Sequence, residues 1–368
     1  MHFSPLELYP PVQNLLRVLA DCGSKAKVTV ITTKAAVEVL NEMISPASNI
    51  RIVRLGFSGQ QVGLLKKYWT YFLFNTVSLA YLLWYKPKSL LYYETISSFP
   101  VLLYKKYLNA KVPVFIHYHE YTTNREYAEG MKQNRIFHKQ EKWLYPRAAW
   151  VSHTNEWRLH QFLSDIEPIV IPNPQVLPNY PPKSWNIRRH AEMNRPVRVV
   201  YVGALSLQTM YVKEFTEFVI SQNGRLVFDI FSYNSDQATR MYLESQNKGL
   251  IRLKSGTDYH ELPGLLSNYD VGVVLYKGHI DNYIYNAPNK LFEYYTCGLD
   301  VWFPQVMQGS MSFITHQTYP KVMSLDFDNL NELQLDRLIE REDFEYQQEL
   351  YASENVLAPF IHNILSDD

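Results

Sequence analysis

The stretch that decides the fold is NYIYNAPNKLFEYYTCGLDVWFP, residues 282–304. It follows the apolar run DVGVVLY at 270–276, which is typical of a buried strand. Asn286 and Pro288 predict the start of a helix, because Asn caps helices and the missing N–H of Pro is tolerated in the first turn. Gly298 predicts its end, before a second apolar run. The stretch therefore predicts a helix between two parallel strands.

Two charged residues in this helix point to a phosphate ligand. Lys290 and Glu293 are three residues apart, so they share one helix face. The N-terminus of a helix offers free N–H groups and a positive dipole end, which suit a diphosphate. A cation close to the helix start can meet the same diphosphate, and a carboxylate one turn later can accept two ribose hydroxyls.

The stretch resembles the donor-binding signature of the glycosyltransferase-B superfamily, especially its family-4-like (group 1) enzymes. Their pattern P-x-K-L-x-E-Y-x-x-x-G-x-x-V is matched here by Pro288, Lys290, Leu291, Glu293, Tyr294, Gly298 and Val301. The resemblance implies an α/β fold of two Rossmann-like domains that face each other across a cleft. It also implies a nucleotide diphosphate sugar as donor substrate, with Glu293 on the ribose. The expected donor-binding residues are Gly203, Lys277, Asn286, Asn289, Lys290, Leu291 and Glu293.

This chain departs from the family pattern in two places. Retaining members carry a second Glu, but Tyr285 stands eight residues before Glu293. They also carry an Arg and a Lys in the loop after the first strand of the second domain, where this chain reads GALSLQT at 203–209. Leaving phosphates need positive charge or aimed N–H groups, so Lys290, the helix N-terminus and Lys277 must substitute. Retention or inversion stays open, and an inactive relative is an alternative.

The first half of the chain predicts a parallel sheet of its own. Strand-like runs at 27–32, 50–55, 89–93 and 112–118 alternate with helical stretches. Only residues 1–3 precede the first turn, although the first strand of such a sheet is usually central. Either this strand is nearly absent or the chain begins upstream.

Polar residues after two of these strands are candidates for catalysis. His117-Tyr118-His119-Glu120 ends one strand, and carboxyl ends of strands face the ligand in such folds. By resemblance, His119 contacts the donor sugar or acts as acid or base, with Glu120 as the alternate base. Glu94 and Ser97 follow another strand and are expected on the acceptor side. A structural role for His119 is the alternative, and neither a metal nor another cofactor is expected.

The bulk composition fits two domains and an anionic partner. The 368 residues are 46% hydrophobic and 20% charged, enough for two cores. Residues 1–150 hold 19 Lys and Arg against 9 Asp and Glu, whereas the remainder holds 17 against 27. A basic first half predicts an anionic membrane surface or a phosphorylated acceptor, unless the asymmetry is chance. No nucleic-acid partner is expected, because dense Lys/Arg runs are absent from the sequence.

One apolar segment requires a membrane test. WTYFLFNTVSLAYLLWY at 69–85 is flanked by Lys66, Lys67, Lys86 and Lys88. As a helix it would extend about 25 Å, short of the roughly 30 Å hydrocarbon core, so a buried or interfacial helix is expected. With only two cysteines, Cys22 and Cys297, a reducing compartment is the simplest interpretation. A cytoplasmic protein, peripheral on the inner face of the membrane, is therefore predicted.

The expected domains are an acceptor-side domain over 1–175, a Pro-rich linker over 176–196, a donor domain over 197–345, and a tail over 346–368. The tail is expected to be helical, from Asp343 to Leu365, and to pack on the first domain.

The leading hypothesis is a hexosyl- or related glycosyltransferase that acts on a saccharide or lipid-linked acceptor in surface-polysaccharide assembly. The alternatives are a nucleotide-sugar epimerase and a non-catalytic binding module. The base, the sugar, the acceptor and the oligomeric state are not predicted.

Overall fold

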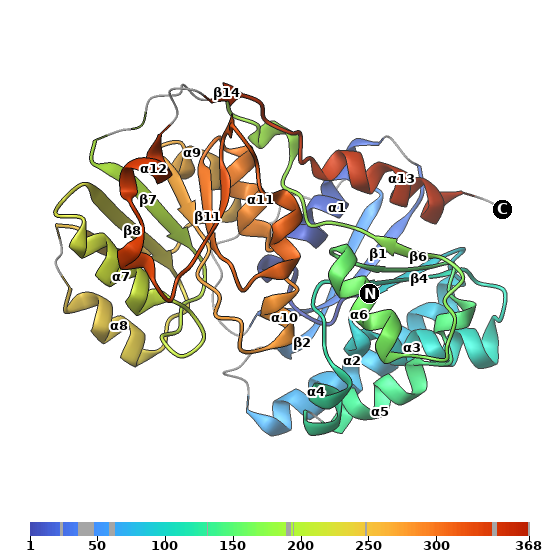
Figure 1. The fold of residues 1–368 in the computed structure, drawn as a ribbon. Coiled ribbons are helices and arrows are strands. Elements are labelled where there is room, and N and C mark those ends of the chain that lie inside the picture. Colours follow the sequence, from blue (N-terminus) through green and yellow to red (C-terminus); the bar gives the residue numbers. More distant parts are fainter. Residues whose placement is uncertain are drawn as a thin grey trace. The chain divides into compact units, whose positions relative to one another are not determined.

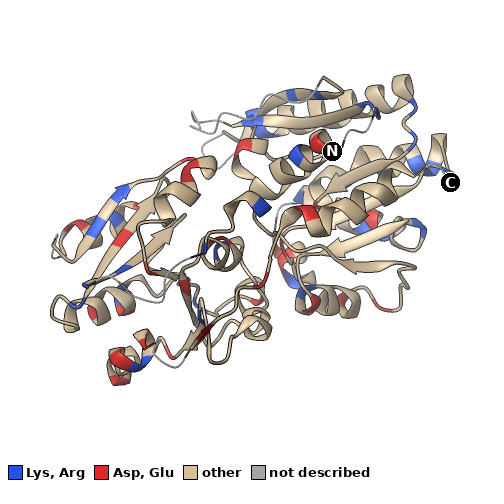
Figure 2. Ribbon diagram, turned by 90° about the horizontal axis from the view of Figure 1, so that it is seen from above, with Lys and Arg blue, Asp and Glu red and all other residues tan. Residues whose placement is uncertain are grey.

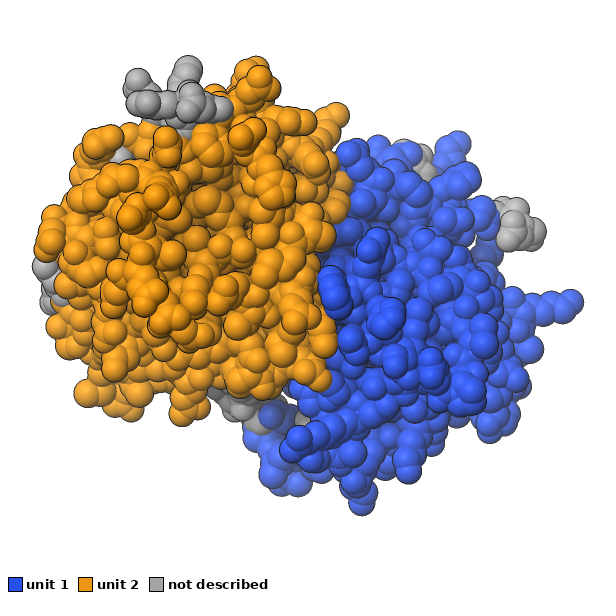
Figure 3. All heavy atoms as spheres, in the orientation of Figure 1, with its two compact units in different colours: residues 1–179, 353–368 blue, residues 180–352 orange. Residues whose placement is uncertain are grey.

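The computed structural model describes residues 1–22, 25–35, 48–58, 63–130, 132–188, 193, 195–246, 249–340 and 344–366. The chain forms two compact units, unit 1 from residues 1–179 with 353–368 and unit 2 from residues 180–352 (Figure 3). Both are α/β units built on parallel strands, as predicted (Figure 1). The units divide at 179/180 and 352/353, whereas the boundaries expected from the sequence stand at 175, 196 and 345.

Unit 2 is a six-stranded parallel sheet in the order β13-β11-β10-β7-β8-β9. Its strands are β7 (Val197–Val202), β8 (Leu226–Ser232), β9 (Ile251–Ser255), β10 (Val271–Val273), β11 (Asp300–Pro304) and β13 (Val322–Leu325). Its helices are α7 (Val212–Ser221), α8 (Gln237–Glu244), α9 (Leu262–Leu266), α10 (Asp281–Ile284), α11 (Asn289–Thr296) and α12 (Leu335–Ile339). The strand order reverses between β7 and β10, the point at which doubly wound sheets bind ligands.

Unit 1 contains a two-stranded and a four-stranded parallel sheet, β1-β2 and β3-β4-β5-β6. The strands are β1 (Val28–Ala35), β2 (Ile50–Ser58), β3 (Leu90–Tyr93), β4 (Val114–Tyr118), β5 (Trp150–His153) and β6 (Pro174–Val176). The helices are α1 (Pro10–Asp21), α2 (Leu64–Tyr85), α3 (Ser98–Leu103), α4 (Asn124–Glu129), α5 (Lys132–Glu141), α6 (Glu156–Asp165) and α13 (Ser353–Leu365).

The first three residues join these two sheets. The His2 N–H donates to the Ile31 carbonyl of β1 at 3.0 Å, and the Tyr93 N–H of β3 donates to the Met1 carbonyl at 3.0 Å. On the next residue, the Phe3 carbonyl accepts the Thr33 hydroxyl at 2.6 Å. The order is therefore β2-β1-(residues 1–3)-β3-β4-β5-β6. A segment of three residues holds the central position, where the sequence predicted a strand that is nearly absent or begins upstream.

The C-terminal segment differs from its prediction. Helix α13 begins at Ser353 and not near Asp343, which lies outside the described residues. Before it, β14 (Glu345–Tyr346) pairs with β12 (Thr318–Tyr319) of unit 2. A short strand replaces the expected helix there because its backbone groups find a partner strand. Helix α13 packs on α1 in unit 1, where Arg17 and Glu354 form an ion pair of 2.8 Å.

The charge asymmetry of the sequence corresponds to the division of the chain into two units. Residues 1–150, which hold the excess of Lys and Arg, belong wholly to unit 1 (Figure 2). Within the described ranges, no helix combines the length and the apolar character needed to cross a bilayer.

Candidate functional site

Three of the predicted donor residues, Gly203, Lys290 and Glu293, lie where the strand order of unit 2 reverses. The chain leaves β7 at Gly203, and the segment after β10 leads through Tyr276. Helix α11 is tied to this point because the Val202 N–H donates to the Tyr294 hydroxyl at 2.9 Å. Gly272 of β10 makes room for the same tyrosine, since a Cβ there would lie 2.2 Å from its ring.

The predicted cap of α11 is wrong. The helix begins at Asn289, with Pro288 as N-cap at ψ 152° and without a side-chain cap. Asn286 lies too early in the chain to cap, and its carbonyl instead accepts the Ser310 hydroxyl at 2.8 Å. The Leu291 N–H bonds to the Pro288 carbonyl at 3.0 Å. The first two N–H groups of α11, those of Asn289 and Lys290, therefore receive no capping side chain.

Lys290 places its ammonium group against the loop that lacks a cation of its own. Gly203 in that loop has φ 138°, and a Cβ there would lie 2.8 Å from the Lys290 Nζ, so a larger residue would displace the ammonium group. The Nζ lies 5.5 Å and 5.7 Å from the ring centroids of Tyr201 and Tyr276. Burial opposes the charge, but the two tyrosine oxygens and Glu293 outweigh it and raise the pKa of Lys290. The side chain is a cation at neutral pH.

Glu293 is a buried carboxylate without a hydrogen-bond partner among the residues described here. It is 8% exposed, one turn after Lys290 on α11. Burial raises the pKa of Glu293 to about 7, and Lys290 opposes this shift. A buried carboxyl group that lacks a partner is costly, and hydroxyl donors from a ligand would satisfy it.

The structure engages two predicted donor residues elsewhere. The Lys277 ammonium forms an ion pair with Glu214 at 2.7 Å and lies over the ring of Tyr211. Leu291 is fully buried in the hydrophobic core of unit 2. Its side chain is therefore a packing residue, because the apolar face of α11 must cover the sheet.

Unit 1 has its own polar cluster, at the carboxyl ends of β3 and β4. Glu94 directly follows β3 with φ 60°, a conformation that costs a non-glycine residue on the order of 1–3 kcal/mol. Its Oε1 accepts the N–H groups of His119 at 2.7 Å and Glu120 at 3.4 Å. Burial, and secondly the Glu120 carboxylate, raise the pKa of Glu94 to about 8. The structure therefore brings Glu94 together with His119 and Glu120, which the sequence nominated in a separate motif.

His119 lies in an aromatic cluster with His2, Tyr9, Tyr93 and His117. Its ring stacks on Tyr93 with centroids 4.9 Å apart. Neither ring nitrogen forms a hydrogen bond of ordinary geometry, although the Asn179 side chain stands beside the ring. Burial lowers the pKa of His119 to about 3, so the imidazole is neutral and a weak base at pH 7.

Sequence reasoning missed the residue that supports His119. The Arg158 guanidinium of α6 donates to the His119 carbonyl at 2.7 Å and to the Thr154 hydroxyl at 3.0 Å. Its distance of 39 residues from His119 leaves no local signal. The predicted acceptor-side Ser97 is buried, and its hydroxyl accepts the Phe3 N–H at 3.0 Å. This Ser97 contact anchors the central segment of the sheet.

In the described part of the chain, no group of three His, Cys, Asp or Glu side chains is placed to hold a metal ion. The predicted site residues that the structure brings close together are the Lys290–Glu293 pair in unit 2 and the Glu94–His119–Glu120 cluster in unit 1.

The sequence matches no protein-family model and no curated protein. The fold is similar to that of sucrose-phosphate synthase from Thermosynechococcus elongatus, with TM-score 0.69, 16% identity, and coverage of 98% of this chain and 93% of that chain. It is also similar to that of the lipopolysaccharide outer core galactosyltransferase WaaB, with TM-score 0.63, 13% identity, and coverage of 99% of this chain and 97% of that chain. A third similar fold is that of UDP-GlcNAc 2-epimerase from Neisseria meningitidis bound to UDP-GlcNAc, with TM-score 0.62, 12% identity, and coverage of 100% of this chain and 99% of that chain. The chain has the glycosyltransferase-B fold that residues 282–304 predicted.

Glu293→Gln tests the burial of this carboxyl group. Because the folded-state pKa is raised from 4.5 to about 7, Glu293 destabilises the fold progressively as the pH rises through that window. We expect the variant to match the wild type at about pH 4 and to exceed its unfolding free energy by about 1–3 kcal/mol at about pH 8. Urea unfolding at both pH values measures this, with the exposed Glu244→Gln as control. Equal stability of the variant and the wild type at the higher pH would contradict the assignment.

Proposed function

We propose that this chain is a glycosyltransferase that moves a sugar from a nucleotide diphosphate sugar to a saccharide or lipid-linked acceptor. The observation that carries the proposal is the Lys290–Glu293 pair at the strand-order reversal of unit 2. One member is a cation held between tyrosine rings, and the other is a buried carboxylate without a hydrogen-bond partner among the described residues. A diphosphate would give Lys290 an anionic partner, and a ribose diol would give Glu293 hydroxyl groups that donate hydrogen bonds to it.

The donor would bind to unit 2 through these groups. Glu293 accepts hydrogen bonds from the ribose hydroxyls, and Lys290 with the uncapped N–H groups of α11 holds the diphosphate. An acceptor oxygen attacks the anomeric carbon, a new C–O bond forms, and the bond from that carbon to the phosphate oxygen breaks. Lys290 stabilises the nucleoside diphosphate that leaves with the electron pair.

The acceptor hydroxyl needs a proton acceptor, and Glu94 fits this task better than His119. A base with a pKa of about 8 has a far greater affinity for a proton than one with a pKa of about 3. The two N–H groups that Glu94 binds fix its orientation, and its φ of 60° is a strain typical of functional residues. Glu120 is exposed beside it and remains the alternate base.

Helix α2 supports an acceptor at a membrane surface. Its first turns expose large apolar side chains, at 87% for Leu65, 63% for Trp69 and 60% for Phe72. Lys66 and Lys67 lie among them. An exposed apolar stripe with adjacent lysines and tryptophan is typical of helices that lie in the interface of an anionic bilayer. This supports a lipid-linked acceptor, a cytoplasmic enzyme at the inner membrane face, and a role in surface-polysaccharide assembly.

An epimerase is the second candidate, because UDP-GlcNAc 2-epimerase bound to UDP-GlcNAc has a similar fold. The two activities differ in their need for an acceptor: an epimerase inverts one carbon of the nucleotide sugar alone, whereas a transferase releases the nucleoside diphosphate only when an acceptor or water is available. A non-catalytic module would bind the nucleotide sugar and leave it unchanged. Product analysis with and without acceptor separates the three.

Donor binding is tested by a thermal-shift screen against UDP, GDP, ADP and CMP and their sugars. A ligand that binds the folded state alone raises the melting temperature. For the nucleotide that shifts the wild type, Glu293→Ala should weaken binding by about 1–3 kcal/mol, through lost hydrogen bonds to a charged acceptor. Lys290→Ala should depress turnover more than Glu293→Ala, and Glu244→Ala should change neither. Unchanged nucleotide affinity in Glu293→Ala would remove the ribose assignment.

The role of Glu94 is tested by the pH dependence of turnover in Glu94→Gln. A base with a pKa of about 8 makes kcat/KM of the wild type rise with pH towards that value, as the carboxylate form accumulates. Gln keeps an oxygen for the two N–H groups but does not accept a proton, so we expect a loss of about 10²–10⁴-fold and a flat profile. The exposed Glu129→Gln of the same unit is the control. A profile that keeps its rise would assign the base elsewhere.

Membrane binding is tested by the double variant Lys66→Gln, Lys67→Gln in vesicle co-sedimentation. Each lysine near an anionic surface contributes about 1 kcal/mol, so the affinity for phosphatidylserine vesicles should fall by roughly 30-fold. The exposed pair Lys213→Gln, Arg240→Gln in unit 2 removes the same charge and should leave vesicle binding unchanged. Equal losses in both double variants would mean that net charge, and not α2, drives binding.

A further inference from the structure

The proposed donor site has few groups that can stabilise the diphosphate as it leaves. The loop at 203–209, which follows β7, contains neither Lys nor Arg. Lys277 forms an ion pair with Glu214 at 2.7 Å, so its charge is already balanced. Of the cations predicted to meet the diphosphate, Lys290 remains. A nucleoside diphosphate carries more negative charge than one ammonium group balances, so a further donor is expected beside Lys290.

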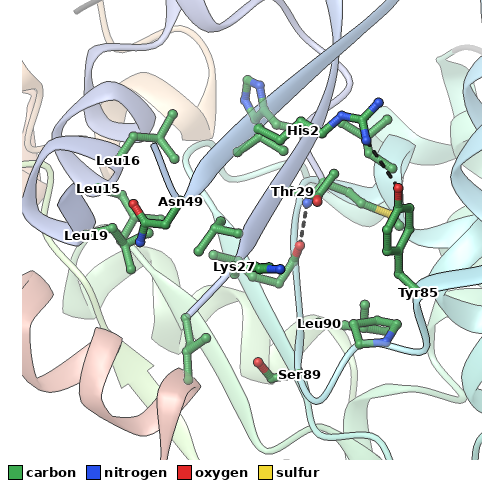
Figure 4. Close-up of a pocket in the computed structure, with 18 of the residues that line it drawn as sticks. His2, Leu15, Leu16, Leu19, Lys27, Thr29, Asn49, Tyr85, Ser89 and Leu90 are labelled. Carbon is green, nitrogen blue, oxygen red and sulfur yellow. Dashed lines mark hydrogen bonds between the residues drawn. The ribbon is translucent and has the colours of Figure 1, made fainter. Parts of the chain in front are cut away.

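The cavity of unit 1 has no contact with Lys290 that would supply this donor. Its volume is about 710 Å³, and leucines of α1 and β3 line part of it (Figure 4). Lys25, Lys27 and Arg51 are the Lys and Arg residues of its lining, and none of them is among the described contacts of Lys290. The neighbours of Lys290 within unit 2 are therefore the candidates.

Tyr276 has a fixed position beside Lys290. An antiparallel β-bridge joins its backbone to Met210, in the segment between β7 and α7. Its ring stacks on that of Tyr283, with centroids 4.7 Å apart and an angle of 28° between the planes. The bridge fixes the backbone and the stack orients the ring, so the hydroxyl group at the end of the ring has a defined place.

The hydroxyl group of Tyr276 has a proton that it can donate. Its oxygen lies 3.4 Å from the Lys290 Nζ, and it acts as the acceptor because an ammonium group only donates. Tyr201, the other tyrosine over which Lys290 lies, uses its own proton on the Ala204 carbonyl at 2.6 Å. The structure gives the Tyr276 O–H no acceptor among the described residues. An anion bound to the Lys290 Nζ would bring an oxygen within reach of this O–H.

We propose that Tyr276 is a catalytic residue whose hydroxyl group donates a hydrogen bond to the leaving diphosphate, beside Lys290. The inference rests on the proposed sugar transfer. When the bond between the anomeric carbon and the phosphate oxygen breaks, its electron pair stays on the diphosphate, which gains one negative charge. Tyr276 keeps its proton throughout. A hydrogen bond to an acceptor that gains charge becomes stronger, so it stabilises the leaving group more than the bound substrate.

The ring of Tyr276 has a separate role that phenylalanine can keep. The Lys290 Nζ lies 5.7 Å from its centroid, and a cation is attracted to the face of an aromatic ring. The Tyr276→Phe variant retains this attraction and the stack on Tyr283, but it lacks the hydroxyl group. The variant therefore separates the hydrogen bond from the packing of the ring.

The test compares the wild type and Tyr276→Phe in their affinity for three ligands that share one base. The ligands are the nucleoside, its diphosphate and its nucleotide sugar, chosen as the set that binds the wild type most tightly among those of UDP, GDP and ADP with glucose or mannose. NMR titration measures affinities down to the millimolar range. We expect a loss of about 10–100-fold for the diphosphate, a smaller loss for the nucleotide sugar, and none for the nucleoside. Tyr242→Phe, which removes a hydroxyl group from α8 of the same unit, should keep all three affinities.

Unchanged affinity for the diphosphate in Tyr276→Phe would overturn the proposal. An equal loss for the nucleoside would do the same, because the hydroxyl group would then act on the ribose, the base or the fold. Equal losses for the diphosphate and the nucleotide sugar would remove the catalytic role, since the leaving group would not be favoured.

The proposed function is judged separately, by Glu293→Ala. If that variant weakens diphosphate binding and Tyr276→Phe does not, the proposal for Tyr276 fails and the donor site stands. If none of the nucleotides binds to the wild type, the donor site fails and the proposal for Tyr276 fails with it.

Discussion

The structure of unit 1 depends on the backbone pairing of residues 1–3 with β1 and β3. Without it the unit would hold two separate sheets, because β1 and β3 share no hydrogen bond in the strand order. Each such bond contributes about 1 kcal/mol net, but an unmade buried bond costs more, so a few contacts decide whether the sheet is continuous. The same segment leads into the turn after Phe3 and places His2 against His119, with ring centroids 6.1 Å apart. The central strand position and the candidate catalytic cluster are thus set by one set of contacts.

Both units place their candidate chemistry where the strand order reverses. In unit 2 this point lies between β7 and β10, which Gly203 and Tyr276 follow. In unit 1 it lies between residues 1–3 and β3, which Glu94 follows. Adjacent loops leave the sheet towards opposite faces at such a point, so side chains can approach a ligand there without a strand between them. The charged groups that influence each other's pKa, Lys290 with Glu293 and Glu94 with Glu120, occur at these two points.

Local features of the sequence predicted helix α11 and the strand after it well. The spacing of Lys290 and Glu293 places both on one helix face whatever surrounds them, and α11 with the strand after it formed close to the expected residues. The cap was wrong by two residues, because Pro288 takes an extended conformation that composition does not reveal. Non-local contacts were beyond reach: the ion pair of Lys277 joins residues 63 apart, and Glu94 binds N–H groups 25 and 26 residues away. The strained conformation of Glu94 has no signature in a single sequence.

Burial couples ligand binding at the proposed donor site to the protonation of Glu293. Glu293 has a pKa of about 7 because its charge is poorly solvated, and Lys290 opposes this shift. Hydroxyl groups that donate to the carboxylate stabilise its charged form and therefore lower its pKa. A ribose bound there would thus drive a proton off Glu293 near neutral pH, and by linkage the affinity would rise with pH through the same window. A bound diphosphate would have the opposite effect on the pKa of Glu293, because it would be a second anion that interacts with Lys290. Affinity for a complete nucleotide sugar is then set by how this one ammonium group is shared between the carboxylate and the phosphates.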